Sequence, residues 1–379
     1  PINIDDPVAF VPTSRQSISD VAVMDDHLIV AYDENVVGQV VRLRHEHQTG
    51  WARETIDVDS NSAIGLGDSS KKSGRIFVSS QGFLSPPSLG LLEADRSAPR
   101  TLRAAPPKFD ASTHRVEQFE ATSADGTKIP YFVVMPRDLA LDGTAPTILF
   151  GYGGFQISFP PAYKPEMGKL WLENGGVFVQ ANIRGGGEFG PNWHQSAIRE
   201  NKQRTWDDFI AVGRDLVARG ITSPEHLGVE GGSQGGLLVG TAFTQAPDLF
   251  NAAIVQIPLF DMLRYQYIGR GASWIGEYGD PRIPEQREWI EGYSPYQKLL
   301  EEKDYPRVFY VTSTADDRTH PSHGRKAAAR MAAQGDEYLY YEDMQGGHSG
   351  GVDNEQRAKL RAMQIVYLLQ QLADDRDGG

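Results

Sequence analysis

The chain has 379 residues, enough for more than one domain, and its 40% hydrophobic and 23% charged residues are ordinary for a soluble globular protein. A formal net charge of −13 disfavours nucleic acid as a partner, because binding of phosphates requires a basic surface. The absence of cysteine excludes disulfides and thiolate chemistry, and the nine histidines show no H-E-x-x-H spacing, so we expect no metal and no cofactor.

The start of the chain carries no basic stretch followed by an apolar one, which is the pattern of a signal peptide. We therefore expect a cytoplasmic protein, and leave the periplasm open because the chain begins at Pro1 instead of Met. No apolar run approaches the roughly 18–20 residues of a membrane helix, so we expect no membrane partner.

Residues 1–107 are predicted to form a small β-rich domain. Short runs rich in β-branched and aromatic residues alternate there with polar turns, and their spacing is typical of antiparallel meanders such as propeller blades or sandwiches. The expected strands are His27–Tyr32, Val36–Leu43, Trp51–Val58, Arg75–Ser79 and Ser88–Glu93. The segment Ala104-Ala-Pro-Pro-Lys108 marks the boundary, because paired prolines stop both helices and sheets.

Residues 108–379 are predicted to form an α/β domain. After a hairpin formed by Val116–Ala121 and Lys128–Met135, expected strands alternate with expected helices. The strands are Thr147–Phe150, Val177–Asn182, Leu227–Glu230, Ala252–Gln256, Arg307–Ser313 and Glu337–Glu342. The helices are Thr205–Arg219, Leu237–Gln245, Pro321–Gln334 and Glu355–Leu372. This alternation is typical of a mostly parallel sheet with helices on both faces.

The most informative residue of this domain is Ser233. It follows the strand Leu227–Glu230 within Gly231-Gly-Ser-Gln-Gly235, and this G-x-S-x-G pattern is that of the nucleophile elbow of α/β-hydrolases. Glycines flank the serine because larger side chains would clash in so tight a turn. The turn exposes the hydroxyl and directs the N–H of Gln234 at the same space, so the hydroxyl can attack a carbonyl while the N–H stabilises the oxyanion. For the pattern alone, an ordinary serine in a tight turn is the alternative.

A reactive serine needs a histidine as general base and an acid that orients it, and α/β-hydrolases carry them on loops after later strands, in the order Ser, acid, His. Asp316 follows the strand Arg307–Ser313, and His348 follows the strand Glu337–Glu342. As alternatives, Asp316 could cap the next helix and His348 could be a solvated loop residue. Those alternatives do not explain why both the order and the strand-end placement fit.

Tyr152 is the candidate for a second oxyanion donor. It lies in Gly151-Tyr-Gly-Gly-Phe155, just after the strand Thr147–Phe150, where α/β-hydrolases supply this donor. A tyrosine hydroxyl can replace the usual backbone N–H. An aromatic ring packed over a glycine turn is the alternative.

Taken together, these segments resemble the prolyl oligopeptidase family of serine peptidases from about Phe109 to the C-terminus. The motifs that carry the resemblance are Gly151–Phe155, Ala181–Gly190, Gly231–Gly236, Asp261–Leu263 with Trp274 and Tyr278-Gly279, Asp316–Arg318 and Gly347-His348. Several long motifs in the family's order are far more specific than a serine elbow alone. The resemblance implies an α/β-hydrolase domain with a triad and an oxyanion hole made by Ser233, Asp316 and His348, and by the Tyr152 hydroxyl and the Gln234 N–H.

The resemblance also implies cleavage of peptides on the carboxyl side of proline. In the family, a tryptophan that matches Trp274 stacks on the proline ring, through dispersion and ring-face contact that needs no charge. The residues implied to complete the substrate site are Phe155, Leu259 and Tyr278, as apolar walls, and Arg318, which matches an arginine that binds the carbonyl of the preceding substrate residue. As an alternative, Trp274 could be a core or lid aromatic.

The sequence departs from the family in two places. Gln234 stands where an asparagine is usual, which leaves the backbone donor unchanged but alters the floor of the pocket. More important, residues 1–107 resemble only the last blades of the family's large N-terminal propeller. A partial propeller exposes strand edges, so we expect self-association or a complementing N-terminal fragment, in addition to proline-containing peptides as substrates.

Three other functions stay open from the sequence. One is a carboxylesterase or other acyl hydrolase that uses the same triad, with Trp274 lining an acyl pocket. Another is a peptidase that prefers a basic residue before the cleaved bond, with Glu277 near the pocket mouth, although the intact Trp274 argues against it. The last is a non-catalytic binding protein, which has no need for the complete set of Ser233, Asp316, His348, Tyr152 and Arg318.

Overall fold

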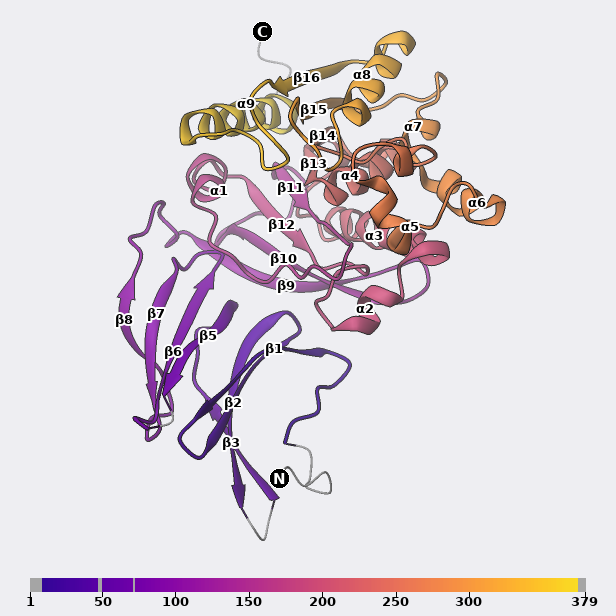
Figure 1. Cartoon of the computed structure of the whole chain (residues 1–379). Coiled ribbons are helices and arrows are strands. Elements are labelled where there is room, and N and C mark those ends of the chain that lie inside the picture. The colour runs from indigo at the N-terminus through magenta and orange to yellow at the C-terminus, as the bar shows by residue number, and fades with distance from the viewer. Residues whose placement is uncertain (1–8, 47–49, 71, 374–379) are drawn as a thin grey trace. The chain divides into compact units, whose positions relative to one another are not determined.

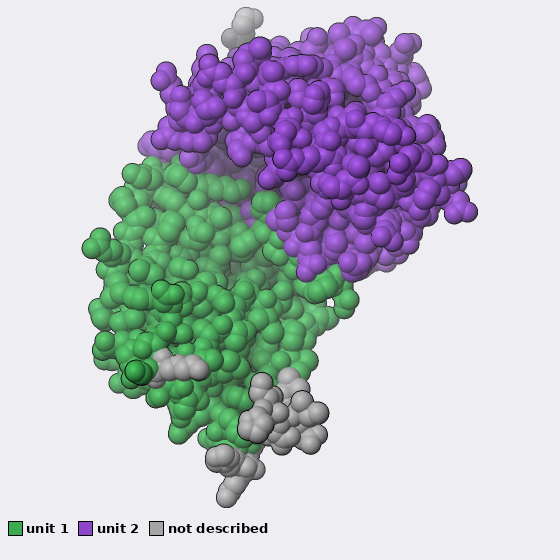
Figure 2. All heavy atoms as spheres, viewed as in Figure 1, with its two compact units in different colours: residues 1–112, 158–165, 187–192 green, residues 113–157, 166–186, 193–379 purple. Residues whose placement is uncertain are grey.

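The computed structural model describes residues 9–46, 50–70 and 72–373. The chain divides into two compact units, which Figure 2 shows in different colours. Unit 1 comprises residues 1–112, 158–165 and 187–192, and unit 2 comprises residues 113–157, 166–186 and 193–379. The predicted boundary after residue 107 lies close to the end of the first segment of unit 1, whereas its two later segments were not predicted from the sequence.

Unit 1 contains two four-stranded antiparallel sheets (Figure 1). In order, the first sheet contains β1 (Gln16–Met24), β2 (His27–Glu34), β3 (Val37–Glu46) and β4 (Gly50–Ile56). The second contains β5 (Ser62–Ser70), β6 (Arg75–Gly82), β7 (Ser88–Glu93) and β8 (Arg100–Ala104). Neighbouring strands follow one another in sequence, as they do in the blades of a propeller. The prediction of an antiparallel β-rich region is confirmed.

The two sheets of unit 1 share a hydrophobic core. Alternate strand positions supply side chains that are almost fully buried there, among them Ile29, Val40, Ile76, Val78 and Leu92. At Gly38 the sheets approach so closely that a Cβ would come within 2.7 Å of Ile64. Sequence reasoning missed β1, β5 and β8, in which polar residues and glycines interrupt the apolar pattern.

Unit 2 is built on an eight-stranded mixed sheet in the order β16-β15-β14-β13-β11-β12-β10-β9. Its strands are β9 (His114–Thr122), β10 (Lys128–Pro136), β11 (Thr147–Phe150), β12 (Val177–Ala181), β13 (Leu227–Gly232), β14 (Ala252–Gln256), β15 (Arg307–Ser313) and β16 (Tyr338–Asp343). β10 pairs antiparallel with β9 and β12, and every other pair is parallel. The carboxyl ends of the parallel strands therefore meet at one edge, where α/β sheets place their sites.

Helices cover both faces of this sheet (Figure 1). Helices α3 (Gln203–Ala218), α4 (Gln234–Gln245), α8 (Ser322–Gln334) and α9 (Asn354–Leu372) pack against its strands. The other α-helices of the described chain are α1 (Pro165–Leu170), α2 (Pro191–Gln195), α5 (Ile275–Tyr278), α6 (Pro284–Tyr293) and α7 (Pro295–Lys298). On β13, a Cβ at Gly228 would lie 2.8 Å from Leu372 of α9, whereas Leu227 points oppositely, toward Gly213 of α3. This confirms the predicted α/β-hydrolase fold. Within the described residues, no helix has the length and apolarity needed to cross a bilayer.

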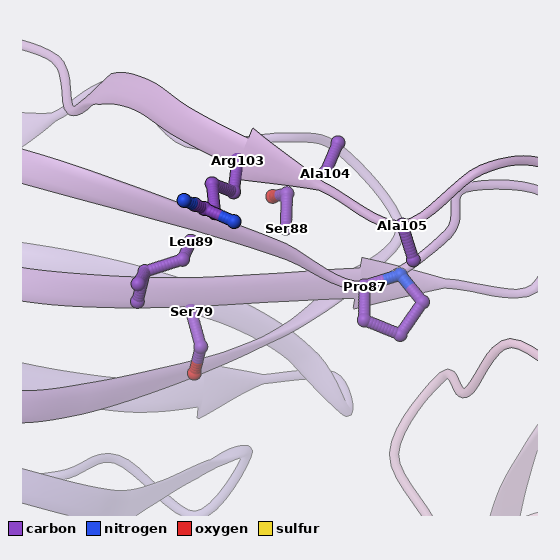
Figure 3. Close-up of a pocket in the computed structure, with 7 residues that line it drawn as sticks. All are labelled: Ser79, Pro87, Ser88, Leu89, Arg103, Ala104 and Ala105. Carbon is purple, nitrogen blue, oxygen red and sulfur yellow. The ribbon is translucent and has the colours of Figure 1, made fainter.

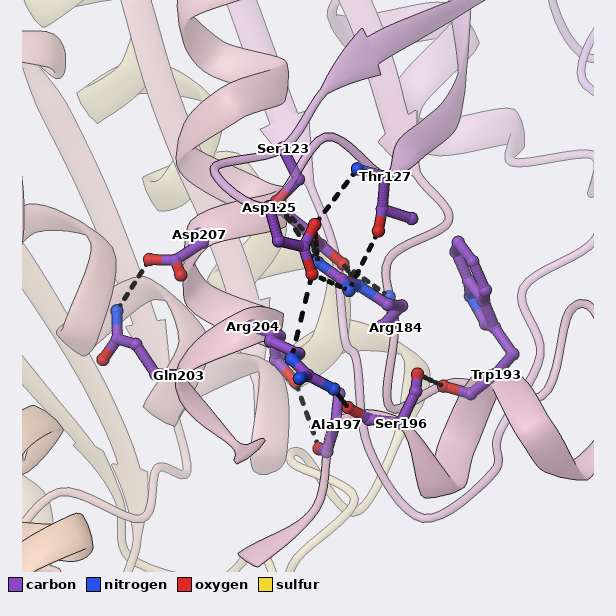
Figure 4. Close-up of polar contacts among 12 residues, drawn as sticks. Ser123, Asp125, Thr127, Arg184, Trp193, Ser196, Ala197, Gln203, Arg204 and Asp207 are labelled. Atoms are coloured by element: carbon purple, nitrogen blue, oxygen red, sulfur yellow. Dashed lines mark hydrogen bonds and ion pairs between the residues drawn. The ribbon is translucent and has the colours of Figure 1, made fainter. Parts of the chain in front are cut away.

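An ion-pair network around the buried Arg184 secures the sheet near its carboxyl edge (Figure 4). The guanidinium of Arg184, which follows β12, lies 2.6 Å from the carboxylate of Asp208 on α3 and 2.5 Å from that of Asp125 in the turn between β9 and β10. The hydroxyl of Ser123 also donates to Asp208 at 2.6 Å. Arg184 belongs to one of the motifs that carry the family resemblance, and here it joins three elements of unit 2.

Candidate active site

Ser233 lies in a strained turn between β13 and α4. Its φ of 58° and ψ of −118° are unusual for a residue other than glycine. The flanking glycines are sterically required, because a Cβ at Gly231 would come within 2.3 Å of the carbonyl oxygen of Gly235. Ser233 is half-buried, so its side chain is not enclosed by the protein. The turn has the geometry expected of a nucleophile elbow.

Asp316 and His348 lie on the loops after β15 and β16 and contact each other. Nδ1 of His348 is 2.9 Å and 3.1 Å from the two carboxylate oxygens of Asp316. Asp316 also accepts hydrogen bonds from Arg318 and Thr319 at distances between 2.8 and 3.1 Å. Burial raises the pKa of Asp316, but the bonds from His348 and Thr319 outweigh it and lower the pKa to about 2. The ionised carboxylate holds the Nδ1 proton and leaves Nε2 free to act as a base.

A chain of hydrogen bonds joins the serine turn to the acid loop. The N–H of Ser233 donates to the carbonyl of Gln256 at 2.9 Å, at the end of β14. The carbonyl of the next residue, Ile257, lies 3.0 Å from the hydroxyl of Thr319, and the same hydroxyl lies 2.8 Å from Asp316. The backbone around Ser233 and the carboxylate of Asp316 are therefore held in one network at the carboxyl edge of the sheet.

Two hydrogen-bond donors lie beside Ser233. Tyr152 is on the loop after β11, where burial raises the pKa of its hydroxyl and a hydrogen bond with the Ser233 side chain opposes that rise. The hydroxyl therefore stays protonated near neutral pH and can donate. The N–H of Gln234 is the first of α4 and has no partner within the helix. An oxyanion hole needs two such donors, and the role of this pair in it stays a prediction.

Aromatic rings pack against one another beside this loop. The ring of Phe155 contacts those of Trp274 and Tyr278 edge-on, with centroid separations of 6.3 Å and 5.8 Å. Phe155 and Trp274 are partly exposed, whereas Tyr278 is fully buried. The hydroxyl of Tyr278 donates to the side chain of Gln234, whose amide donates to the carbonyl of Gly153 at 3.1 Å. The glutamine that distinguishes this chain therefore links the aromatic wall to the loop that carries Tyr152.

The remaining predicted substrate residues differ in their exposure. Leu259 is only 1% exposed, so its predicted place in an apolar wall, like that of the buried Tyr278, stays a prediction. Arg318 is exposed, and its backbone carbonyl accepts a hydrogen bond from the N–H of Arg270 at 2.7 Å. The charge of Arg318 is one of the smaller influences that oppose the burial-driven rise in the pKa of Tyr152. The predicted contact of Arg318 with the substrate stays a prediction.

Sequence reasoning missed Lys202 and His194, which contact Glu277. Nζ of Lys202 lies 2.8 Å from one carboxylate oxygen of Glu277, and Nε2 of His194 lies 2.7 Å from the other. His194 and Glu277, together with Phe155 and Trp274, line a cavity of about 410 Å³. Lys202 stands in a polar stretch of sequence that is typical of an exposed turn, so no local signal indicated its complete burial.

Comparison with known sequences agrees with the geometry. The model described as the prolyl oligopeptidase family matches residues 164–375. An uncharacterized peptidase from Sinorhizobium fredii is 42% identical over 376 residues, covering 99% of this chain and 52% of the relative. A prolyl endopeptidase from Elizabethkingia miricola is 32% identical over 350 residues, covering 91% of this chain and 49% of the relative. The chain thus spans about half the length of the curated relatives it matches.

Comparison with solved structures leads to the same family. A post-proline cleaving enzyme from Rickettsia typhi is similar with a TM-score of 0.87 at 36% identity, covering 96% of this chain and 52% of that chain. Prolyl oligopeptidase B from Galerina marginata is similar with a TM-score of 0.88 at 28% identity, again covering 96% of this chain and 52% of the other. Since the family model matches more than half of its residues, including Ser233, Asp316 and His348, this chain belongs to the prolyl oligopeptidase family.

Proposed function

We propose that this protein is a serine peptidase that hydrolyses peptide bonds on the carboxyl side of proline through an acyl-enzyme. The observation that carries the proposal is the pairing of His348 with an ionised Asp316, at the sheet edge where the elbow holds Ser233. Similarity to a prolyl endopeptidase and to a post-proline cleaving enzyme supports proline as the residue before the cleaved bond.

In the proposed mechanism, Nε2 of His348 takes the proton of the Ser233 hydroxyl as the oxygen attacks the scissile carbonyl carbon. The tetrahedral oxyanion accepts hydrogen bonds from the Tyr152 hydroxyl and the Gln234 N–H. His348 then gives the proton to the leaving amine, the C–N bond breaks, and an ester with Ser233 remains. Water, deprotonated by His348, attacks this ester, releases the acid and restores the hydroxyl. Asp316 keeps the imidazole in the required tautomer throughout.

The proposed specificity rests on Trp274 and Phe155, whose partly exposed rings offer flat apolar surfaces to a pyrrolidine ring. Arg318, exposed beside the acid loop, is proposed to bind the carbonyl of the substrate residue before the proline. Selection of a basic residue by Glu277 is disfavoured, because Lys202 neutralises one carboxylate oxygen and His194 contacts the other. The pocket therefore lacks an unpaired carboxylate at Glu277.

Hydrolysis of three matched substrates tests the proposal. Blocked Gly-Pro and Gly-Arg anilides differ only in the residue before the cleaved bond. A simple ester has no such residue, so its hydrolysis measures the activity of the triad independently of specificity. We expect strong preference for the proline anilide. Turnover of the ester alone would identify the protein as a carboxylesterase or related acyl hydrolase, and preference for the arginine anilide would identify a peptidase for basic residues. A folded sample that turns over none of them and does not react with a fluorophosphonate would be a binding protein.

The substitution Trp274→Ala tests whether the ring of Trp274 binds the proline of the substrate. We expect kcat/KM for the proline anilide to fall by about 30-fold or more, the loss typical of an aromatic anchor worth about 2 kcal/mol. Hydrolysis of the small ester is expected to change little, because the ester has no ring to stack. Trp51→Ala, at a partly buried tryptophan of unit 1, is the control. Equal losses on both substrates would assign Trp274 a structural role.

An apolar surface on unit 1 is proposed as a contact for polypeptide outside this chain. Phe77 and Leu89 lie on the outer face of the β5–β8 sheet and are 38% and 39% exposed, and Leu102, at a bulge of β8, is 39% exposed. Leu89 also lines a cavity of about 440 Å³ (Figure 3). Strand β8, at the edge of this sheet, is exposed along its whole length. Relatives are about twice as long as this chain, and an uncovered apolar face next to a free strand edge favours association.

We therefore expect this chain alone to self-associate through that outer face. Sedimentation velocity over a range of protein concentrations is expected to show oligomers that Leu89→Lys reduces to monomers. Lys128→Glu, on an exposed site in unit 2, serves as the control for a change of charge. A chain that stays monomeric at every concentration would refute this contact.

A further inference from the structure

A buried cluster formed by Lys202, Glu277 and His194 lies beside the loop that carries Tyr152; it is called here the ion-pair cluster. The side chains of Lys202 and Glu277 are 0% and 4% exposed, and that of His194 is 13% exposed. Burial lowers the pKa of Lys202, and the charge of Glu277 offsets this only in part. Burial also raises the pKa of Glu277, but the charge of Lys202 and the contacts with Lys202 and His194 outweigh it, so the pKa of Glu277 is lowered. A buried ion pair gains little net stability, because desolvation offsets the attraction. Stability alone therefore does not explain the cluster.

The loop beside the cluster has a strained backbone. Gly153, Phe155 and Gln156 have positive φ angles of 64°, 57° and 58°. Glycine tolerates this conformation, but it is unfavourable for Phe155 and Gln156, which carry a Cβ. Strained backbone persists only where the surrounding structure fixes it. The shape of this loop consequently depends on the groups that bind its backbone.

The ion-pair cluster supplies such groups on both sides of Gly154. Nζ of Lys202 donates to the carbonyl of Gly153 at 2.9 Å, directly after Tyr152. The carboxylate oxygen of Glu277 that binds Lys202 also accepts the N–H of Phe155 at 3.2 Å. One ion pair therefore holds the backbone next to the oxyanion donor and next to the aromatic wall.

We propose that the ion-pair cluster positions the hydroxyl of Tyr152 for the oxyanion and the ring of Phe155 for the substrate. The inference rests on the proposed function for the reaction itself, and it assigns Lys202 and Glu277 as positioning residues, since neither contacts the reacting atoms. His194 fixes the second carboxylate oxygen of Glu277 from the side of the cavity. Because the oxyanion exists only after attack, loss of the cluster affects kcat more than KM.

The double substitution Lys202→Met/Glu277→Leu tests this role. It removes both charges together, and such apolar replacements of buried ion pairs are usually tolerated. We expect kcat for the proline anilide and for the ester to fall about 100-fold, the loss that a displacement of about 1 Å can cause, with KM for the ester nearly unchanged. In a Tyr152→Phe background the same substitutions are expected to cost little further kcat on the ester, because the hydroxyl that they misplace is already absent.

Tyr367→Phe is the matched control for loss of a buried polar contact. It deletes the hydrogen bond that the Tyr367 hydroxyl accepts from the N–H of Ala253 at 2.9 Å, between α9 and β14, and it is expected to keep the wild-type kcat. Equal losses of kcat on the ester from the double substitution in the wild-type and Tyr152→Phe backgrounds would overturn the proposal, as would an unchanged kcat in the folded double variant.

Two further measurements keep the proposal testable. If the double variant does not fold, Glu277→Gln and His194→Ala remove single contacts, and a wild-type kcat in both would overturn the proposal. A crystal structure of any folded cluster variant needs no turnover: a displaced backbone at residues 153–155 supports the proposal, and an unmoved one overturns it. Neither the crystal structure nor ester hydrolysis depends on a proline in the substrate. A failure of the proposed proline specificity can therefore be distinguished from a failure of the positioning role.

Discussion

Ser233→Ala is expected to reduce kcat on the proline anilide and on the ester by about 10⁶-fold, the loss found when a serine peptidase loses its nucleophile. The reason is that no other hydroxyl occupies the elbow between β13 and α4, where Gln234 follows Ser233 as the first residue of the helix. Steady-state kinetics with active-site titration measures the loss. Residual turnover from the oxyanion donors alone is expected to survive at a low level.

The same substitution is expected to leave the free energy of unfolding within about 0.5 kcal/mol of wild type, because it removes one half-buried hydroxyl and no packed carbon. Thermal unfolding checks this expectation. Ser322→Ala, at a half-buried serine that begins α8, is the matched control and keeps full activity. Retained activity in Ser233→Ala would mean that the nucleophile is another residue.

Asp316→Asn is expected to lower kcat about 10⁴-fold while changing KM little, as the same change does in other serine peptidases. An asparagine amide can donate to Nδ1 of His348, which then places the proton on Nε2 and leaves no base for Ser233. Asp317→Asn is the matched control, because Asp317 is exposed and pairs with Arg270 instead of His348. Equal effects of the two substitutions would contradict the assignment of Asp316.

The lowered pKa of Asp316 also predicts how the stability of the folded protein changes with pH. Its pKa of about 2 in the folded protein lies below the ordinary value of 3.8, so ionisation of this group favours the folded state. The resulting stabilisation is complete above about pH 4 and is lost as the pH falls toward 2. Asp316→Asn is therefore expected to reduce the dependence of stability on pH within that window, which thermal unfolding in acidic buffers can measure.

The strands of unit 2 could be predicted from sequence because each is a short apolar run between turns. β14 and β15 begin and end at the predicted residues, since both are almost entirely buried and contain few polar residues. In contrast, the edge strand β8 was missed, because all its residues are exposed and no apolar alternation marks it. The small helices α5 and α7 were also missed, because four residues give too little periodicity to detect.

Residues of the candidate site could be predicted from the strand pattern where a potentially reactive side chain follows a predicted strand. Ser233, Asp316 and His348 each stand just after a predicted strand, and parallel strands bring such loops to one edge. The contact between Lys202 and Glu277 joins residues 75 positions apart, on a turn and a short helix that no pattern marked. Only the fold brings these two side chains together, so no local pattern predicts their contact.

Mass spectrometry after reaction with a blocked Gly-Pro diphenyl phosphonate is the most direct test of the proposed function. The phosphonate reacts with an activated nucleophile next to a proline-binding pocket. The position of the adduct identifies the nucleophile, and the rate of its formation measures the preference for proline. We expect one adduct, on the peptide that contains Ser233, which forms much faster than with the Gly-Arg analogue and does not form in Ser233→Ala. An adduct on another residue, or equal rates for the two phosphonates, would contradict the proposed function.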